Sequence, residues 1–268
     1  MKKLLLLLVL PFILISASMP MTSVRYYPNL RMDPSIFLHN SVAVVTDRKT
    51  GKKYLNMPTA GANMGPGHLM IIGDRPTGTG EFPATQAVWD SNEGWVCLEK
   101  GAAGEFVMGG HGDHQRWHWD SWGDFAIYKM AGPNSGVFEG DRKMVYCLQP
   151  SMKYKYRWPD AGQPNARKMS YINTNRGIFP FTCGNDDPGA KKLGQRLPNG
   201  TTDVYYPVLN ETHCALPLWG DGVYALIGVM DPDEKVIEWN EEDNWGFAVV
   251  EIRGDNIKVL FLVEPGFM

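Results

Sequence analysis

The sequence predicts an all-β protein built as a β-sandwich, and two observations support this fold class. The apolar residues show almost no helical period. In addition, 29 glycines and 19 prolines, spread along the chain, divide it into short runs rich in Val, Ile, Phe and Tyr. Such runs, bounded by turn residues, are typical of strands, and many short strands interrupted in this way favour a sandwich.

Eight runs are the clearest expected strands, at residues 41–47, 69–74, 104–110, 124–130, 143–149, 223–230, 246–254 and 257–264. Residues 151–200 differ because they are rich in Pro, Asn, Gly, Lys and Arg, so we expect a long irregular loop there. Long loops within compact domains are usually functional or disordered. Cys183 lies inside this segment, and we expect a disulfide to hold the loop in place.

The first 18 residues predict a cleaved secretory signal. Lys2 and Lys3 precede an apolar run over 4–15 that only Pro11 interrupts, and small residues follow it. The run is shorter than the roughly 20 residues that a membrane-spanning helix needs, so a retained membrane anchor is the less favoured alternative. We therefore expect residues 19–268 to form a single secreted domain with its own core.

Charge and cysteine content narrow the class of protein further. The formal net charge is −3, which gives no reason to expect nucleic acid or an anionic membrane as a partner. An even number of cysteines in a secreted chain suggests two disulfides, for which three pairings are open. The cysteines are Cys97, Cys147, Cys183 and Cys214. None forms a Cys-x-x-Cys pair, so a zinc ribbon or a thioredoxin-like site is not expected.

Three histidines lie within the stretch HGDHQRWHWD, residues 111–120. Because alternate residues of a strand share a face, His114, Arg116, His118 and Asp120 would lie on one face. His111 would lie just upstream, in a turn made by the neighbouring glycines. Imidazoles suit copper, zinc, iron or nickel. The alternative is a row of polar surface histidines, and Arg116 favours that alternative because its fixed charge repels a cation.

The remaining aromatic and histidine residues of note are expected to be structural. Trp117, Trp119 and Trp122 are expected in the core rather than in a binding platform. The other three histidines have no ligand spacing and are expected at the surface or in loops; they are His39, His68 and His213.

The stretch HGDHQRWHWDSWGDFAIY resembles the copper-binding strand of lysyl oxidases, which carries a histidine, two residues and then His-x-His-x-His. Four further stretches resemble that family in the same order along the chain: YPNLRMDP (27–34), GDRKMVYCLQPS (140–151), TTDVYYPVL (201–209) and GDGVYALIGVMDPDEKVIEWNEEDNW (220–245). The resemblance covers most of the chain after the signal. It implies the β-sandwich-like catalytic domain of lysyl oxidases with long irregular loops.

The resemblance also implies roles for particular residues. His111, His114 and His118 fall on family histidines, and the last two match copper ligands. Arg116 occupies the position of the central ligand, and Asp120 either replaces that ligand or pairs with Arg116 in a salt bridge. The family's lysyl tyrosine quinone cofactor would be formed from Lys143 and Tyr205, although a shift of one residue would exchange Tyr205 for its neighbour Tyr206.

Two hypotheses about function follow from this resemblance. The first is a secreted copper amine oxidase, which converts the primary amine of a protein lysine or of a small molecule to an aldehyde and releases ammonia and hydrogen peroxide. Retention of both cofactor residues favours it. The second is a secreted binding or structural module on the same scaffold without metal, which Arg116 favours. A metal hydrolase is disfavoured, because no His-Glu-x-x-His motif accompanies the histidines.

Overall fold

The protein is all-β in the part of the chain that the structure describes. The computed structural model describes residues 22–34, 37, 42–74, 80–111, 114–133, 135–136, 138–146, 148, 152–153, 192–205 and 215–263. Within these residues there are nineteen strands and no α-helix, and every strand pair is antiparallel. The predicted fold class is therefore confirmed at the level of all-β.

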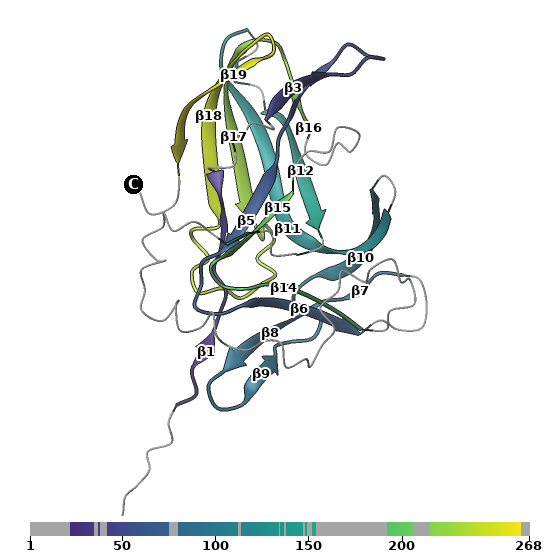
Figure 1. The fold of residues 1–268 in the computed structure, drawn as a ribbon, viewed down its shortest axis with the longest axis vertical. Coiled ribbons are helices and arrows are strands. Elements are labelled where there is room, and N and C mark those ends of the chain that lie inside the picture. The colour runs from purple at the N-terminus through teal and green to yellow at the C-terminus, as the bar shows by residue number, and fades with distance from the viewer. Residues whose placement is uncertain are drawn as a thin grey trace, which may run out of the picture.

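The largest sheet has seven strands, most of which lie in the upper part of the molecule in Figure 1. Its order is β19-β18-β17-β11-β10-β7, with β12 paired to the other side of β11. Its strands are β7 (Phe82–Pro83), β10 (Glu105–His111), β11 (His114–Ala131), β12 (Phe138–Tyr146), β17 (Gly222–Met230), β18 (Trp245–Arg253) and β19 (Asn256–Val263). Because β11 is 18 residues long, it pairs with β10 through its first part and with β12 and β17 through its last part.

A four-stranded sheet in the order β13-β15-β5-β2 packs on the large sheet. Its strands are β2 (Leu30–Met32), β5 (Thr59–Asn63), β13 (Met152–Lys153) and β15 (Thr201–Tyr205). A Cβ added at Gly61 of β5 would lie 2.5 Å from the Trp122 ring of β11, and one at Gly228 of β17 would lie 2.6 Å from Met32 of β2. The two sheets approach this closely because glycine leaves room for the facing side chain, and together they form a sandwich.

Two smaller sheets complete the described fold. The five-stranded sheet consists of β1 (Arg25–Tyr26), β6 (Leu69–Asp74), β8 (Thr85–Asp90), β9 (Gly94–Cys97) and β14 (Lys192–Leu197). It packs on the lower end of the large sheet, where Gly73 meets the rings of Phe82 and Phe106. The three-stranded sheet consists of β3 (Ala43–Thr46), β4 (Lys53–Asn56) and β16 (Ala215–Leu218).

Tryptophans of β11 lie at the centre of the main core. Trp117 and Trp119 are fully buried and Trp122 is 1% exposed, which confirms the prediction that they are core residues. The Trp117 ring packs edge-on against Phe82 with ring centroids 4.8 Å apart. Trp119 Nε1 donates to the Ala103 carbonyl at 2.6 Å, so its polar atom is satisfied as a buried indole requires.

The expected strands all overlap observed ones, but the expected irregular segment does not stay irregular at its ends. Residues 192–197 form β14, which pairs with β6 from Leu197↔Leu69 to Lys192↔Asp74. The apolar positions in KLGQRL are too few to have indicated a strand. Residues 154–191 lie outside the described residues, as do residues 1–21, which include the predicted signal. No helix in the described residues is long and apolar enough to span a membrane.

The close contact between the two sheets yields a stability prediction. Replacing Gly61 by alanine forces a methyl group onto the Trp122 ring, and overpacking of this kind costs about 1–3 kcal/mol. Denaturant unfolding should show the loss as a lower midpoint. Gly80→Ala is the matched control, because a Cβ there meets no described atom within 4 Å. Equal midpoints for the two variants would contradict the proposed sheet contact.

Candidate functional site

The histidine stretch forms a β-hairpin between β10 and β11. The register pairs His111 with His114, Gly109 with Arg116, and Val107 with His118. His111 is therefore the last residue of β10 rather than part of a glycine turn, which corrects the expectation from the sequence. Gly109 and Gly110 also belong to the strand. As a directly opposed pair, His111 and His114 have backbones close enough for cross-strand contact.

His118 lies inside the protein and not on its surface. Its side chain is 2% exposed, between two fully buried tryptophans of the same strand. Both faces of β11 are therefore covered at this level, and the alternative of a polar surface row is wrong for His118. The side chains of His111, His114 and Arg116 are outside the described part of the structure.

Asp120 holds the turn that precedes β10. Its Oδ1 accepts a hydrogen bond from the Glu105 backbone N–H at 2.9 Å and another from the Ser121 hydroxyl at 3.0 Å. One carboxylate oxygen thus has a structural role, which makes Asp120 a poorer candidate for the missing ligand than a free carboxylate would be. Neither this contact nor any other described one tests the predicted salt bridge with Arg116.

The predicted metal ligands are only partly within the described residues, because the side chains of His111 and His114 lie outside them. No group of three or more His, Cys, Asp or Glu side chains suited to a metal occurs among the described residues. Three imidazoles would suit copper by donor type, whereas the Arg116 guanidinium at the intervening register position would oppose a cation.

The two predicted cofactor residues lie on different sheets. Lys143 belongs to β12 of the large sheet and pairs with Asp124 of β11; its side chain is outside the described part. Tyr205 ends β15 of the four-stranded sheet, opposite Thr59, and its half-buried ring packs against the main core. Tyr206 is not described.

His68 lies in the loop before β6, as the sequence predicted, but it is buried within that loop, with 3% exposure. Its Nδ1 accepts a hydrogen bond from the Asn199 backbone N–H at 3.3 Å. Burial, and to a lesser degree the charge of Arg196, lower the pKa of His68 to about 4. The imidazole is therefore neutral and structural at pH 7. His39 and His213 lie outside the described residues.

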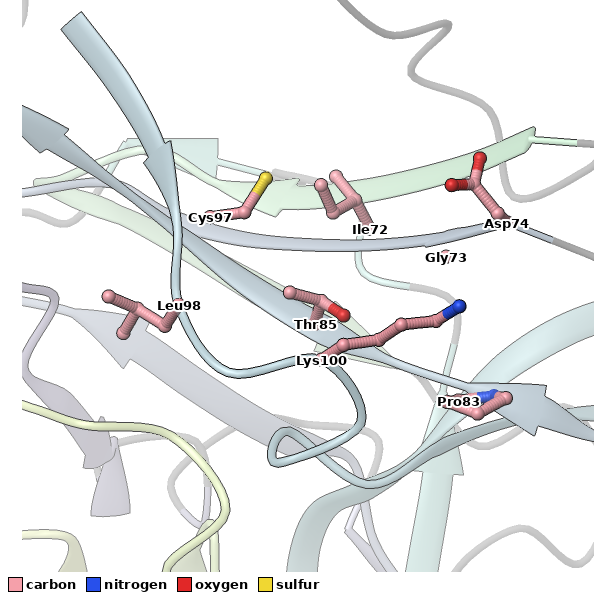
Figure 2. A pocket seen from close by; sticks show the side chains of 8 residues that line it. All are labelled: Ile72, Gly73, Asp74, Pro83, Thr85, Cys97, Leu98 and Lys100. Carbon is pink, nitrogen blue, oxygen red and sulfur yellow. The ribbon is translucent and has the colours of Figure 1, made fainter. Parts of the chain in front are cut away.

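A cavity of about 170 Å³ beside β6 was not predicted from the sequence (Figure 2). Its lining includes the Cys97 thiol at one end and the charged groups of Asp74 and Lys100 at the other. Cys97 is an exposed free thiol; the other three cysteines lie outside the described residues, so the predicted pairing is not seen here. Partial burial, and next the charge of Asp74, raise the pKa of the Cys97 thiol. A neutral thiol is a poor nucleophile, so this cavity lacks the usual requirement for thiol catalysis.

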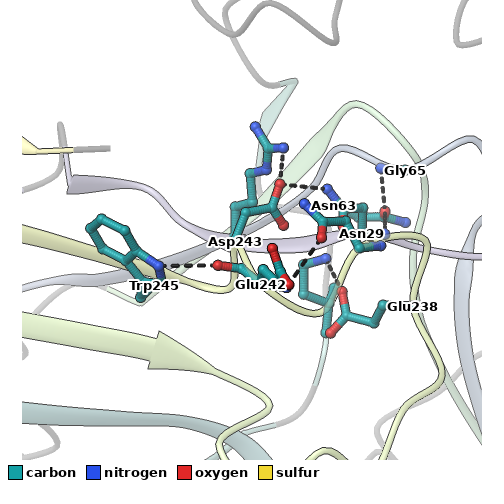
Figure 3. A network of polar contacts seen from close by, with 10 residues as sticks. Asn29, Asn63, Gly65, Glu238, Glu242, Asp243 and Trp245 are labelled. Atoms are coloured by element: carbon teal, nitrogen blue, oxygen red, sulfur yellow. Dashed lines mark hydrogen bonds and ion pairs between the residues drawn. The ribbon is translucent and has the colours of Figure 1, made fainter. Parts of the chain in front are cut away.

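A buried polar network joins the loop at residues 231–244 to β2 and β5 (Figure 3). Arg31 and Asp243 form a buried ion pair, and Asn29 Nδ2 also donates to Asp243 Oδ2 at 3.3 Å. The Leu30 backbone N–H donates to Glu238, whose other carboxylate oxygen accepts from Asn244 Nδ2 at 2.8 Å. Sequence reasoning noted this acidic turn only as part of the family resemblance. The charged Arg31 in an otherwise apolar strand was the signal that could have indicated an internal partner.

Two carboxyl groups of this loop favour the protonated form. Burial is the main cause that raises the pKa of Asp231 to about 7, against hydrogen bonds from the Val236 and Lys235 backbone N–H groups. Burial likewise raises the pKa of Glu238 well above its usual range. The loop therefore buries less negative charge at neutral pH than its sequence suggests.

Comparison with known proteins gives no match for this chain, either to a family model or to a curated protein. Of the predicted site residues, the structure brings His111 opposite His114 and puts His118 on the same strand.

The raised pKa of Asp231 predicts how stability depends on pH. Unfolded aspartate ionises near pH 3.8, whereas the folded group holds its proton up to about pH 7. The folded state therefore binds more protons in this window, and its stability falls as pH rises through it. Asp231→Asn removes this titration. The free energy of unfolding of the variant minus that of wild type should therefore increase by on the order of 3 kcal/mol between pH 4 and pH 7. Urea unfolding at several pH values measures the difference, and a constant difference between the two proteins from pH 4 to pH 7 would contradict the prediction.

Cys97 should react slowly with thiol reagents at neutral pH. The Asp74 carboxylate disfavours the thiolate, so Asp74→Asn should increase the rate of iodoacetamide alkylation at pH 8 by roughly twofold or more. Mass spectrometry of the Cys97 peptide gives the rate. Glu99→Gln changes an exposed acid close by in sequence and should leave it unaltered; an equal increase in both variants would rule out the specific contribution of Asp74.

Proposed function

We propose that this protein is a secreted, copper-dependent amine oxidase that acts on the primary amine of protein lysine or of small molecules. The products are an aldehyde, ammonia and hydrogen peroxide, with oxygen as the electron acceptor and water as co-reactant. The observation that best supports this proposal is the hairpin that pairs His111 with His114 and continues along the same strand to the buried His118.

The strand of Tyr205, β15, and the strand of Lys143, β12, occupy corresponding places in the strand orders of the two packed sheets. In the four-stranded sheet, β2 lies against Gly228 of β17 and β5 lies against Trp122 of β11. The next strand after β5 is β15, and the next strand after β11 on that side is β12. The order β2-β5-β15 therefore runs alongside β17-β11-β12, which supports a position of β15 over β12.

The two residues also occur at the same level of the sandwich. Tyr205 pairs with Thr59, two residues from Gly61, and Lys143 pairs with Asp124, two residues from Trp122. Because Gly61 lies on Trp122, both residues are close in register to one inter-sheet contact. The faces differ, however, because Lys143 shares the register face of Asp124, which alternates with the buried Phe125. Tyr205 shares the face of Gly61 toward the large sheet, so the register by itself counts against a cross-link in the sandwich interior.

The chain's own groups have defined tasks in this proposal. Lys143 must reach the ring as a free amine, which a buried environment favours by lowering the pKa of a lysine. Tyr205 must present its ring to that amine, and half-burial against the core restricts its motion. The quinone formed from this pair would supply the electron acceptor that unmodified side chains cannot provide.

His111, His114 and His118 are the proposed copper ligands. The cross-strand pair His111 and His114 supplies two imidazoles, and His118 supplies a third from inside the core. The neutral imidazole is the form that ligates a metal. Asp120 is the remaining predicted ligand, although its Oδ1 already accepts two hydrogen bonds.

The second candidate is a secreted binding module on the same scaffold without metal or quinone. Arg116 favours it, because a fixed guanidinium between two ligand positions raises the cost of bringing in a cation. The structural use of the Asp120 carboxylate favours it as well.

Peptide mass spectrometry of protein expressed with copper distinguishes the two candidates. The oxidase predicts a cross-linked peptide that joins Lys143 to Tyr205, together with an absorbance that a hydrazine reagent abolishes. Tyr205→Phe should remove both signals, whereas Tyr206→Phe should retain them. Separate, unmodified peptides of Lys143 and Tyr205 in copper-replete protein would rule out the oxidase proposal and favour the binding module.

A further inference from the structure

The loop at residues 231–244 holds two large apolar side chains in water. Ile237 is 53% exposed and Trp239 is 61% exposed, while Val236 and Glu238 alternate with them and are buried. Single exposed apolar residues are common on protein surfaces. Here two large apolar side chains are exposed at alternate positions of one loop. Whether they form a binding surface depends on how firmly the loop backbone is held and on the charges exposed beside them.

The backbone beneath them is fixed, although the loop has no regular secondary structure. Six consecutive backbone N–H groups, from Lys235 to Asn240, all donate to protein acceptors, at distances between 2.7 and 3.1 Å. Side chains of Asp231, Gln86, Glu241 and Asn29 supply five of these acceptors, and the Pro28 carbonyl supplies the sixth.

Gln86 holds Ile237 through two hydrogen bonds. Its Oε1 accepts from Ile237 N at 2.9 Å and its Nε2 donates to Ile237 O at 2.8 Å. Gln86 is itself 3% exposed on β8, so a strand of the five-stranded sheet holds Ile237 from behind. The Trp239 backbone donates to Pro28 O at 2.7 Å. A partner would therefore meet two anchors that are already ordered, which lowers the entropy lost on binding.

The exposed groups around the two anchors are mostly acidic. Asp233, Glu234, Glu241 and Glu242 are exposed, and Lys235 is the exposed cation of the loop. Four carboxylates and one ammonium give a formal balance of −3. An apolar centre with an acidic rim matches a polypeptide that carries apolar residues between lysines or arginines. The open face of a tryptophan also attracts such cations.

We propose that Ile237 and Trp239 form a docking surface for a basic, lysine- or arginine-rich polypeptide. The surface requires neither copper nor the quinone, so it goes beyond the proposed oxidase and holds equally for the binding module. Apolar contact with the two anchors supplies most of the affinity, and the acidic rim selects the charge of the partner and makes binding depend on salt.

A labelled 15-residue peptide with lysines flanking two leucines tests this surface by fluorescence anisotropy with the full chain. Trp239→Ala should weaken binding at least tenfold, and the double variant Glu234→Gln/Glu242→Gln should weaken it severalfold. Higher salt should weaken wild-type binding and affect the double variant less. The same peptide with glutamates in place of lysines should not bind.

Trp219→Ala is the matched control, because Trp219 is 51% exposed in a different loop. It should bind the peptide like wild type, and thermal unfolding should show that all variants remain folded. The docking surface is excluded if wild type does not bind the lysine peptide, if the two tryptophan variants lose affinity equally, or if the glutamate peptide binds as well. Binding of neutral oligosaccharide through Trp239, without binding of the peptide, would also overturn it.

Discussion

The contact between Gly61 and the Trp122 ring determines how the two main sheets meet. It permits an approach that a Cβ at Gly61 would prevent, and it sets the position of the four-stranded sheet along β11. Gly228 repeats the arrangement with the roles reversed, since the large sheet supplies the glycine and Met32 of β2 supplies the side chain. The two contacts fix both the separation and the relative position of the sheets. Any site that draws residues from both sheets depends on them.

The same strand β5 ends at a residue that organises the polar side of the fold. Asn63 is fully buried, and its Oδ1 accepts from the backbone N–H groups of Asn29 and Gly65. Its Nδ2 donates to the carbonyls of Gly67 and Leu197. One side chain thus satisfies four backbone groups from three parts of the chain, each of which would be costly to leave unpaired in the interior. Packing at Gly61 and hydrogen bonding at Asn63 therefore act on one short strand.

Local pattern was sufficient to predict the strands, but not their environment. Val, Ile and aromatic runs between turn residues predicted β6, β17 and β18 because those signals are local. β14 was missed because Lys192, Gln195 and Arg196 occupy half of its six residues, and only its pairing with β6 makes it a strand. His118 and His68 were partly misjudged for the same reason: burial comes from distant elements, and the residue type alone favours the surface. The position of His111 in the hairpin depended on whether Gly109 and Gly110 form a turn or extend the strand, and glycine is compatible with both.

The loop at residues 231–244 has some carboxyl groups in the protein interior and others exposed to water, and the two sets are accommodated differently. Asp231, Glu238 and Asp243 are buried, and Arg31 is the cation paired with them. If all three carboxyls were ionised, two negative charges would remain uncompensated in a low-dielectric interior. The raised pKa of Glu238 favours its neutral form, and the pKa of about 7 for Asp231 leaves that carboxyl only partly ionised at neutral pH. Asp243 pairs with Arg31. The buried side of the loop is then close to neutral and can hold the backbone with many hydrogen bonds. The remaining carboxyl groups of the loop, on Asp233, Glu234, Glu241 and Glu242, are exposed in the same loop as Trp239, where an incoming cation can reach them.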